Sequence, residues 1–193
     1  MATTITTSFL KQGTCGSTGN VHTCVRIGNS GVTTDCDIGG SGSGSSYRNG
    51  VLARFADVPA GISSATLTIT YSQSGSDYWN ADQTLSVKAC ANFTNSTTGE
   101  NLPTTYGSAK TAELEGGTAS IAITVTDQVK AALANGSKCL WITANAANNR
   151  KRVSAVKLSY VPINVVYNGQ NVTGVVYNGT TLTGLKYNGT TIF

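Results

Sequence analysis

The feature of this sequence that most restricts its fold is an alternation of apolar residues with threonine. It is clearest at residues 62–72, where the apolar positions are Ala65, Leu67, Ile69 and Tyr71 and the residues between them are threonines. Successive side chains of a β-strand point to opposite faces of a sheet. This period of two therefore predicts a strand with one buried face and one polar face.

Strand-like patterns recur along most of the chain. They predict further strands at residues 3–13, 20–28, 51–55, 83–93, 119–127, 138–146 and 153–161. One short helix is expected at 125–136, where Thr126 or Asp127 would cap the start and Asn135-Gly136 would end it. Residues 94–117 have no strong periodicity and are expected to form a long polar connection. The pattern predicts an all-β fold, a jelly-roll-like β-sandwich with one short helix over residues 1–161.

The charge pattern argues against a nucleic-acid-binding surface. Charged residues make up 11% of the chain, and much of the net charge of +4 comes from the run Arg150-Lys151-Arg152. A nucleic-acid site would need a wider basic face with interleaved aromatic residues. We interpret the run as a solvated hairpin loop, and the alternative is a patch that contacts an acidic polymer or a neighbouring subunit.

The cysteines do not form a metal-binding pattern. The chain has five of them and one histidine, and no CxxC spacing, so neither a metal site nor a cofactor is predicted. Cys90 and Cys139 lie in apolar strand patterns and are expected to be buried free thiols. Cys15 and Cys24 flank a glycine-rich turn, and their pairing across a hairpin is an alternative.

No catalytic arrangement is recognisable. A nucleophile activated by histidine would have to use His22, which lies in a strand-like run and is interpreted as a polar strand residue. The carboxylate pairs are local, whereas a glycosidase needs two carboxylates that face each other across a cleft. We therefore expect that the protein is not an enzyme.

The best candidate for ligand binding is the segment GSDYWNAD, residues 75–82. Tyr78 and Trp79 are flanked there by Asp77 and Asn80, and aromatic faces beside polar groups suit sugar rings. The alternative is that Trp79 closes one end of the sandwich. Trp141 alternates with Leu140 and Ile142, so packing in a core or an interface is expected for it.

Residues 162–193 form a second region, which repeats a ten-residue unit three times around Tyr-Asn-Gly. Asn-Gly between short β-rich runs is a strong signal for a two-residue hairpin turn. That turn would place Tyr167 opposite Gln170 and Val166 opposite Asn171, with equivalent registers in the other copies. Alternation then puts the apolar residues of each hairpin on one face, and these are Val165, Tyr167, Val172, Val175, Tyr177, Leu182, Leu185, Tyr187 and Ile192.

This apolar face of the tail needs a partner, because an isolated two-stranded hairpin is only marginally stable in water. It would be covered by the chain's own sandwich, by folding of the repeats into a small prism, or by the same tail of sister chains. Since each repeat needs neighbours to bury its face, we favour a homo-oligomer, for instance a trimer, in which the tail is the assembly face.

The stretch VLARFADVPAGISSATLTI, residues 51–69, resembles the signature of DNRLRE-type domains. These are jelly-roll sandwiches of bacterial surface and secreted proteins, related in shape to carbohydrate-binding modules. The later stretch ITVTDQVKAALANGSKCLWI matches the family's order of strand, short helix and closing strands. The resemblance covers residues 1–161 in outline, although the family's tryptophan-bearing middle segment is not evident at residues 92–117.

The Tyr-Asn-Gly tail is similar to C-terminal repeats of phage structural proteins, especially those of phages that infect Gram-positive bacteria. The resemblance implies a virion structural protein, such as a capsid decoration, fibre or tail-tip component, with other virion proteins as partners. A carbohydrate-binding module that contacts a cell-surface glycan is the alternative.

The N-terminal sequence adds an expectation about location. Residues 1–11 have neither the basic nor the apolar part of a secretory signal. No apolar run approaches the roughly 20 residues that span a bilayer. We therefore expect synthesis in the host cytoplasm, location in the virion and no membrane partner.

Overall fold

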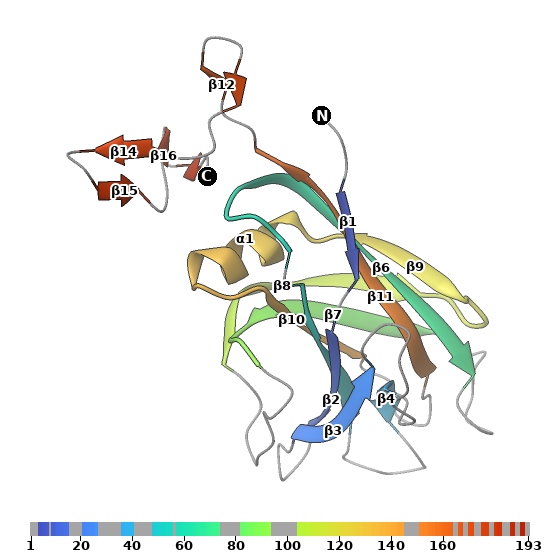
Figure 1. Ribbon diagram of the computed structural model, residues 1–193. Helices are drawn as coiled ribbons and strands as arrows, with labels where there is room; N and C mark the ends of the chain where they lie inside the picture. Colours follow the sequence, from blue (N-terminus) through green and yellow to red (C-terminus); the bar gives the residue numbers. More distant parts are fainter. Residues whose placement is uncertain are drawn as a thin grey trace.

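The computed structural model describes residues 4–7, 9–15, 21–26, 36–40, 48–55, 57–73, 82–93, 104–144 and 151–163, and short pieces of the C-terminal region at 166–167, 170–171, 175–177, 180–182, 186–187 and 190–191. In this part of the chain, antiparallel strands predominate and there is one helix. The all-β class predicted from the sequence is confirmed. We call the part up to residue 163 the two-sheet body (Figure 1).

The first sheet is built around the long strand β11 (Lys151–Pro162). One edge of β11 pairs with β6 (Ile62–Gln73), which in turn pairs with β9 (Ser120–Thr124). The other edge pairs with β1 (Thr4–Thr7) near one end and with β4 (Cys36–Gly40) near the other.

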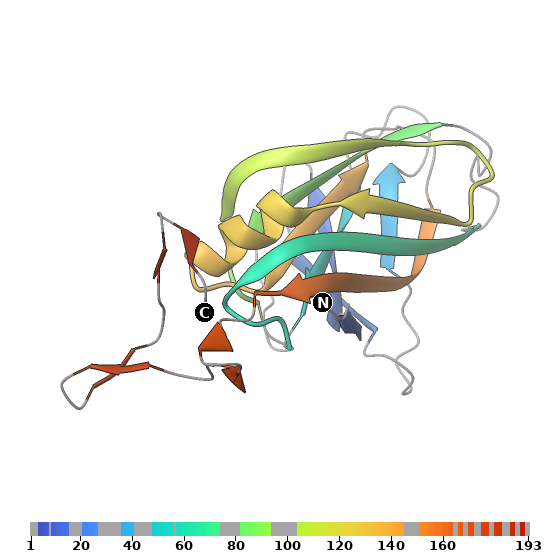
Figure 2. The same ribbon diagram turned by 90° about the horizontal axis from the view of Figure 1, so that it is seen from above.

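The second sheet is also antiparallel. In spatial order its strands are β8 (Thr105–Leu114), β7 (Gln83–Cys90), β10 (Cys139–Ala144), β5 (Arg48–Arg54), β2 (Phe9–Cys15) and β3 (Val21–Arg26). The helix α1 (Thr126–Ala134) contacts β6 of the first sheet and β7, β8 and β10 of the second. It lies at one end of the two sheets, as Figures 1 and 2 show.

The N-terminal segment and strand β4 each contribute to both sheets. The single N-terminal strand predicted at residues 3–13 is wrong: β1 pairs with β11 in the first sheet, and β2 pairs with β5 in the second. Strand β4 belongs to both sheets, since its residues 36–38 pair with β11 and its last two glycines pair with β5. Gly39 has a φ of 88° at this transition, a conformation that glycine adopts without steric cost.

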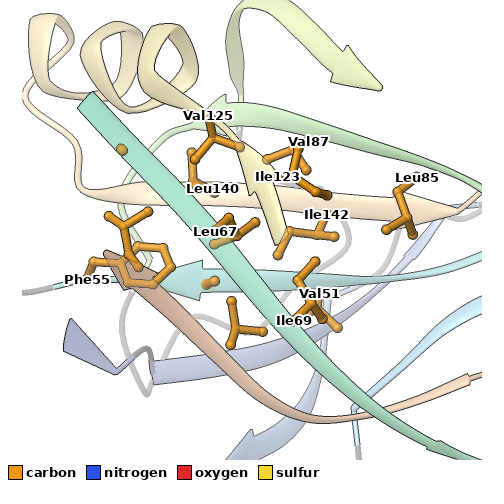
Figure 3. Close-up of a cluster of buried hydrophobic side chains, with 14 of the residues drawn as sticks. Val51, Phe55, Leu67, Ile69, Leu85, Val87, Ile123, Val125, Leu140 and Ile142 are labelled. Atoms are coloured by element: carbon orange, nitrogen blue, oxygen red, sulfur yellow. The ribbon is translucent and has the colours of Figure 1, made fainter. Parts of the chain in front are cut away.

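The core lies between the sheets and follows the alternation of the sequence. The predicted inward residues of β6 are all buried (Ala65, Leu67, Ile69 and Tyr71), as are Leu85, Val87 and Ala89 of β7. Leu67 and Ile69 meet Val51, Leu140 and Ile142 of the opposite sheet in the cluster that Figure 3 shows. The burial of these side chains removes apolar surface from water, which is the main favourable term in folding.

Two local predictions are wrong. Residues 94–117 were expected to be a connection without strands, but β8 occupies ten of them at the edge of the second sheet. The N-cap of α1 is Val125, and no side chain caps the helix. The hydroxyl of Thr126 instead accepts a hydrogen bond from the Ala65 N–H at 3.0 Å, so it ties the helix to β6. The predicted C-terminal end at Asn135-Gly136 is confirmed, with a φ of 67° at Gly136.

Candidate functional site

The predicted glycan-binding residues Asp77, Tyr78, Trp79 and Asn80 lie outside the described residues. Their segment follows Gln73, the last residue of β6, and precedes Gln83, the first residue of β7. It therefore connects the first sheet to the second. Gln73 is also the register partner of Lys151, the first residue of β11.

The C-terminal repeats contribute three pairs of short strands. These are β12 (Val166–Tyr167) with β13 (Gln170–Asn171), β14 (Val175–Tyr177) with β15 (Thr180–Leu182), and β16 (Lys186–Tyr187) with β17 (Thr190–Thr191). Tyr167 pairs with Gln170, Tyr177 with Thr180 and Tyr187 with Thr190. Each pair is a separate two-stranded sheet, drawn outside the two-sheet body in Figures 1 and 2.

The predicted assembly face is only partly within the described residues. Tyr167, Val175, Tyr177, Leu182 and Tyr187 belong to the short strands, and Val175 pairs with Leu182. The other four members, Val165, Val172, Leu185 and Ile192, lie outside the described residues.

The second sheet carries an additional apolar cluster on the face turned away from the core. We call it the outer cluster, and it consists of Leu52, Cys90, Phe93, Cys139 and Trp141. Leu140 and Ile142 belong to the core, so the intervening Trp141 points to the other face. Its exposure is 8%. The burial expected for Trp141 is thus confirmed. The sequence signal for the second cluster is that Cys139 and Trp141 are apolar on one face of β10, as Leu140 and Ile142 are on the other.

Two thiols lie side by side in the outer cluster. Cys90 at the end of β7 and Cys139 at the start of β10 are register partners, and both are buried and free, as predicted. Ser137 joins their backbones: its hydroxyl donates to the Cys90 carbonyl oxygen at 2.6 Å and accepts from the Cys139 N–H at 3.1 Å. The register of β2 and β3 places Cys24 beside residues 10–12, away from Cys15, so it does not support the alternative pairing of those two.

The segment that follows β7 is held over this cluster by polar contacts. The Asn92 amide donates to the Gly136 carbonyl oxygen at 2.8 Å and accepts from the Lys138 N–H at 3.3 Å. Its oxygen also lies 3.6 Å from the Cys139 sulfur. From β5, on the far side of β10, the Arg54 guanidinium donates to the Phe93 carbonyl oxygen at 3.0 Å.

Burial keeps both thiols protonated. Loss of solvation raises the pKa of Cys90, and a negative charge on Cys139 would raise it further. Burial also raises the pKa of Cys139, but hydrogen bonds from Phe93, Ser137 and Lys138 and the charge of Arg54 oppose that rise. Because the thiolate is the reactive form of cysteine, neither residue is an activated nucleophile in this structure.

Two residues of the basic run, Lys151 and Arg152, are not in the solvated loop predicted from the sequence. Lys151 is fully buried at the first position of β11, and Arg152 is half-buried in the same strand. Burial lowers the pKa of Lys151, and the nearby Asp82 carboxylate opposes this effect. Lys151 thus lies where β11 begins, opposite Gln73 at the end of β6, while Arg150 lies outside the described residues.

The described part of the chain contains no group of three metal-ligating side chains that could hold an ion. A cavity between α1 and the sheets, lined by Phe55, Val58, Val129, Ala132, Leu133, Lys138, Leu140 and Leu158, has a volume of only about 10 Å³. That space holds one water molecule at most, so it is a packing defect and not a ligand site.

Comparisons with protein-family models and with curated proteins found no match for this chain. Among the described residues, no helix is both long and apolar enough to cross a membrane.

Proposed function

We propose that this chain is a non-enzymatic structural protein of a bacteriophage virion, a capsid decoration, fibre or tail-tip component. In this proposal residues 1–161 form a jelly-roll-like body, and residues 162–193 form a tail of three hairpin repeats through which copies of the chain associate. The observation that carries it is the isolation of the three short strand pairs. Among the described strands, the two strands of each pair bond only to each other, and neither joins a sheet of the body.

The stability of such short strand pairs favours association. A two-stranded hairpin buries too little surface to be stable alone in water. Three of them with equivalent registers therefore need a common partner, and copies of the same repeat supply a surface of matching spacing. Closed symmetric assemblies are the usual outcome when identical surfaces meet. The similarity of the repeat to tails of phage structural proteins supports the virion assignment.

The oligomeric state of the full chain tests the proposed assembly. We expect a homo-oligomer by light scattering, and a monomer when Tyr167, Tyr177 and Tyr187 are all replaced by serine. The matched control replaces Asn171, Thr181 and Thr191, which alternate to the other face of the predicted hairpins, and it should remain oligomeric. A monomeric full chain, or an oligomer that survives the tyrosine substitutions, would contradict assembly through the tail.

The genes beside this one test the virion assignment independently. Genes for capsid or tail proteins on both sides would support it. A position among genes of metabolism or of a bacterial cell surface would contradict it, whatever the oligomeric state.

The alternative function is binding of a cell-surface glycan through residues 77–80. The observation in its favour is that the segment connects β6 of the first sheet to β7 of the second, and loops that connect strands often carry binding sites. A glycan array tests it with Trp79→Ala. Tyr106→Ala, which removes a half-buried aromatic ring from the edge strand β8, is the control. Binding that persists in Trp79→Ala, or no binding by the original chain, would remove this candidate.

A further inference from the structure

Cys90 and Cys139 form a closely placed pair of thiols for which neither the proposed assembly nor glycan binding has a use. They are directly opposite each other on antiparallel strands, and side chains of opposed residues leave the sheet on the same face. Both belong to the outer cluster and are free and buried.

The backbone geometry suits a covalent link between them. The Ser137 hydroxyl bridges the two backbones, because it donates to the Cys90 carbonyl oxygen at 2.6 Å and accepts from the Cys139 N–H at 3.1 Å. Directly opposed residues of antiparallel strands, such as these two, have Cα atoms about 4.5–5.5 Å apart. Disulfides span Cα distances of about 4.4–6.8 Å, most often 5.5–6 Å.

The side chains need only a small adjustment. Opposed Cβ atoms lie about 4.5–5.5 Å apart in antiparallel sheets, while a disulfide brings them to about 3.5–4.5 Å. An approach of about 1 Å is required. The pair lies at the end of β7 and at the start of β10, where fewer ladder contacts oppose such a movement than in the middle of the sheet.

We propose that Cys90 and Cys139 form a cross-strand disulfide when a small-molecule disulfide, such as oxidised glutathione, reaches them. This inference does not rest on the proposed function. The Cys139 thiolate attacks one sulfur of glutathione disulfide and displaces one glutathione thiolate. The Cys90 thiolate then attacks the Cys139 sulfur of the mixed disulfide and displaces the second. Two protein thiols are oxidised, one glutathione disulfide is reduced to two thiols, and the protons of Cys90 and Cys139 pass to the displaced thiolates.

The order of attack follows from the surroundings of the two sulfurs. Cys139 receives hydrogen bonds and the positive charge of Arg54, all of which favour its thiolate, whereas Cys90 is more completely desolvated. Cys139 is also the thiol beside Asn92, whose amide is exposed. Access therefore requires residues 91–93 to lift from the outer cluster, and the hydrogen bonds of Asn92 set how often this happens.

Peptide mapping of the full chain tests the proposal. The reduced protein is incubated with oxidised glutathione, unfolded in the presence of an alkylating agent and digested with trypsin. Cleavage after Lys88, Lys110, Lys138 and Arg150 gives peptides 89–110 and 139–150, each with a single cysteine. We expect these two peptides to be joined, with a mass lower by two hydrogen atoms than their sum, in preference to every other pairing. Dithiothreitol should separate them.

Two variants and a second arm sharpen the test. Asn92→Ala should accelerate formation of the link several-fold, and Cys139→Ser should abolish it. In the second arm the chain refolds from denaturant in a buffer of reduced and oxidised glutathione, so that slow access in the folded state cannot hide the reaction. Recovery of peptides 89–110 and 139–150 separately alkylated in both arms, or joined mainly to other cysteines, would overturn the proposal.

Discussion

The indole of Trp141 lies against the backbone of Gly50, on the outer face of the second sheet. A Cβ atom on Gly50 would lie 2.6 Å from Cζ2 of the indole and 2.9 Å from the Ile142 carbonyl oxygen. Both distances are well below van der Waals contact, and the second involves backbone that cannot swing away. Glycine is therefore required at position 50 because of the close approach of a neighbouring strand and its tryptophan.

Gly50→Ala should destabilise the protein by about 1–3 kcal/mol, the usual cost of overpacking a closed site. Chemical denaturation, followed by Trp fluorescence and by circular dichroism, measures this difference. Gly136→Asn is the control, because no atom lies within 4 Å of a Cβ at that position and asparagine tolerates a positive φ. Equal stabilities of the two variants would show that the indole moves aside without cost.

Ser137→Ala should also destabilise the protein, by about 1–3 kcal/mol. The side chain has an exposure of 1%, and its hydroxyl bonds to backbone groups of both Cys90 and Cys139. Alanine leaves these buried groups without that partner. Ser154→Ala is the matched control, since its hydroxyl also donates to a backbone carbonyl, that of Thr70, but is exposed. A loss no greater than that of the control, in the same denaturation experiment, would contradict the role assigned to Ser137.

The sequence predicts most strands of the body, because a sheet with one buried face imposes a period of two. It fails where the period is weak. Strand β8 is mostly exposed on both faces, so it has no apolar alternation that could be recognised. Strand β11 is predicted at residues 153–161 and confirmed, although a register shift between Val153 and Ala155 moves the buried positions from Val153 to Val156 and Leu158.

The features of the candidate site depend on register, which a single sequence does not specify. That Cys90 and Cys139 are both buried follows from their apolar neighbours. That they are opposite each other follows only from the pairing of β7 with β10, two strands with β8, β9 and α1 between them in the chain. Similarly, the burial of Lys151 results from the position at which β11 begins. A run of three basic residues alone suggests that the lysine is exposed.

Thr126→Val should weaken the connection between α1 and the first sheet. The hydroxyl of Thr126 accepts the Ala65 N–H at 3.0 Å, and valine keeps the shape but leaves this donor without its acceptor. We expect a loss of about 1–2 kcal/mol. Thr124→Val, at an exposed position of the adjacent strand β9, should change stability by less than about 0.5 kcal/mol. If Thr126→Ser is as unstable as Thr126→Val, the hydroxyl is not the stabilising group.

The stability of the reduced protein should fall as the pH rises above 9.0, the ordinary pKa of the cysteine thiol. Burial raises the pKa of Cys90 in the folded state, so above pH 9.0 the unfolded chain loses this proton while the folded chain keeps it. The stabilisation is complete below pH 9.0 and is lost above it by up to about 1.4 kcal/mol per pH unit. Cys90→Ala should therefore show a shallower alkaline slope than the original chain.

The comparison of slopes isolates Cys90 because the other titrating groups are the same in both proteins. Burial also raises the pKa of Tyr71 and lowers that of Lys151, and these two groups act in opposite directions above pH 9.0. Ser86→Ala, a change on β7 that removes no titrating group, is the control and should keep the original slope. Urea denaturation with a reductant present, at pH values on both sides of 9.0, gives the measurement. An unchanged alkaline slope in Cys90→Ala would mean that its thiol ionises equally well in the folded protein, and hence that residues 91–93 leave it open to water.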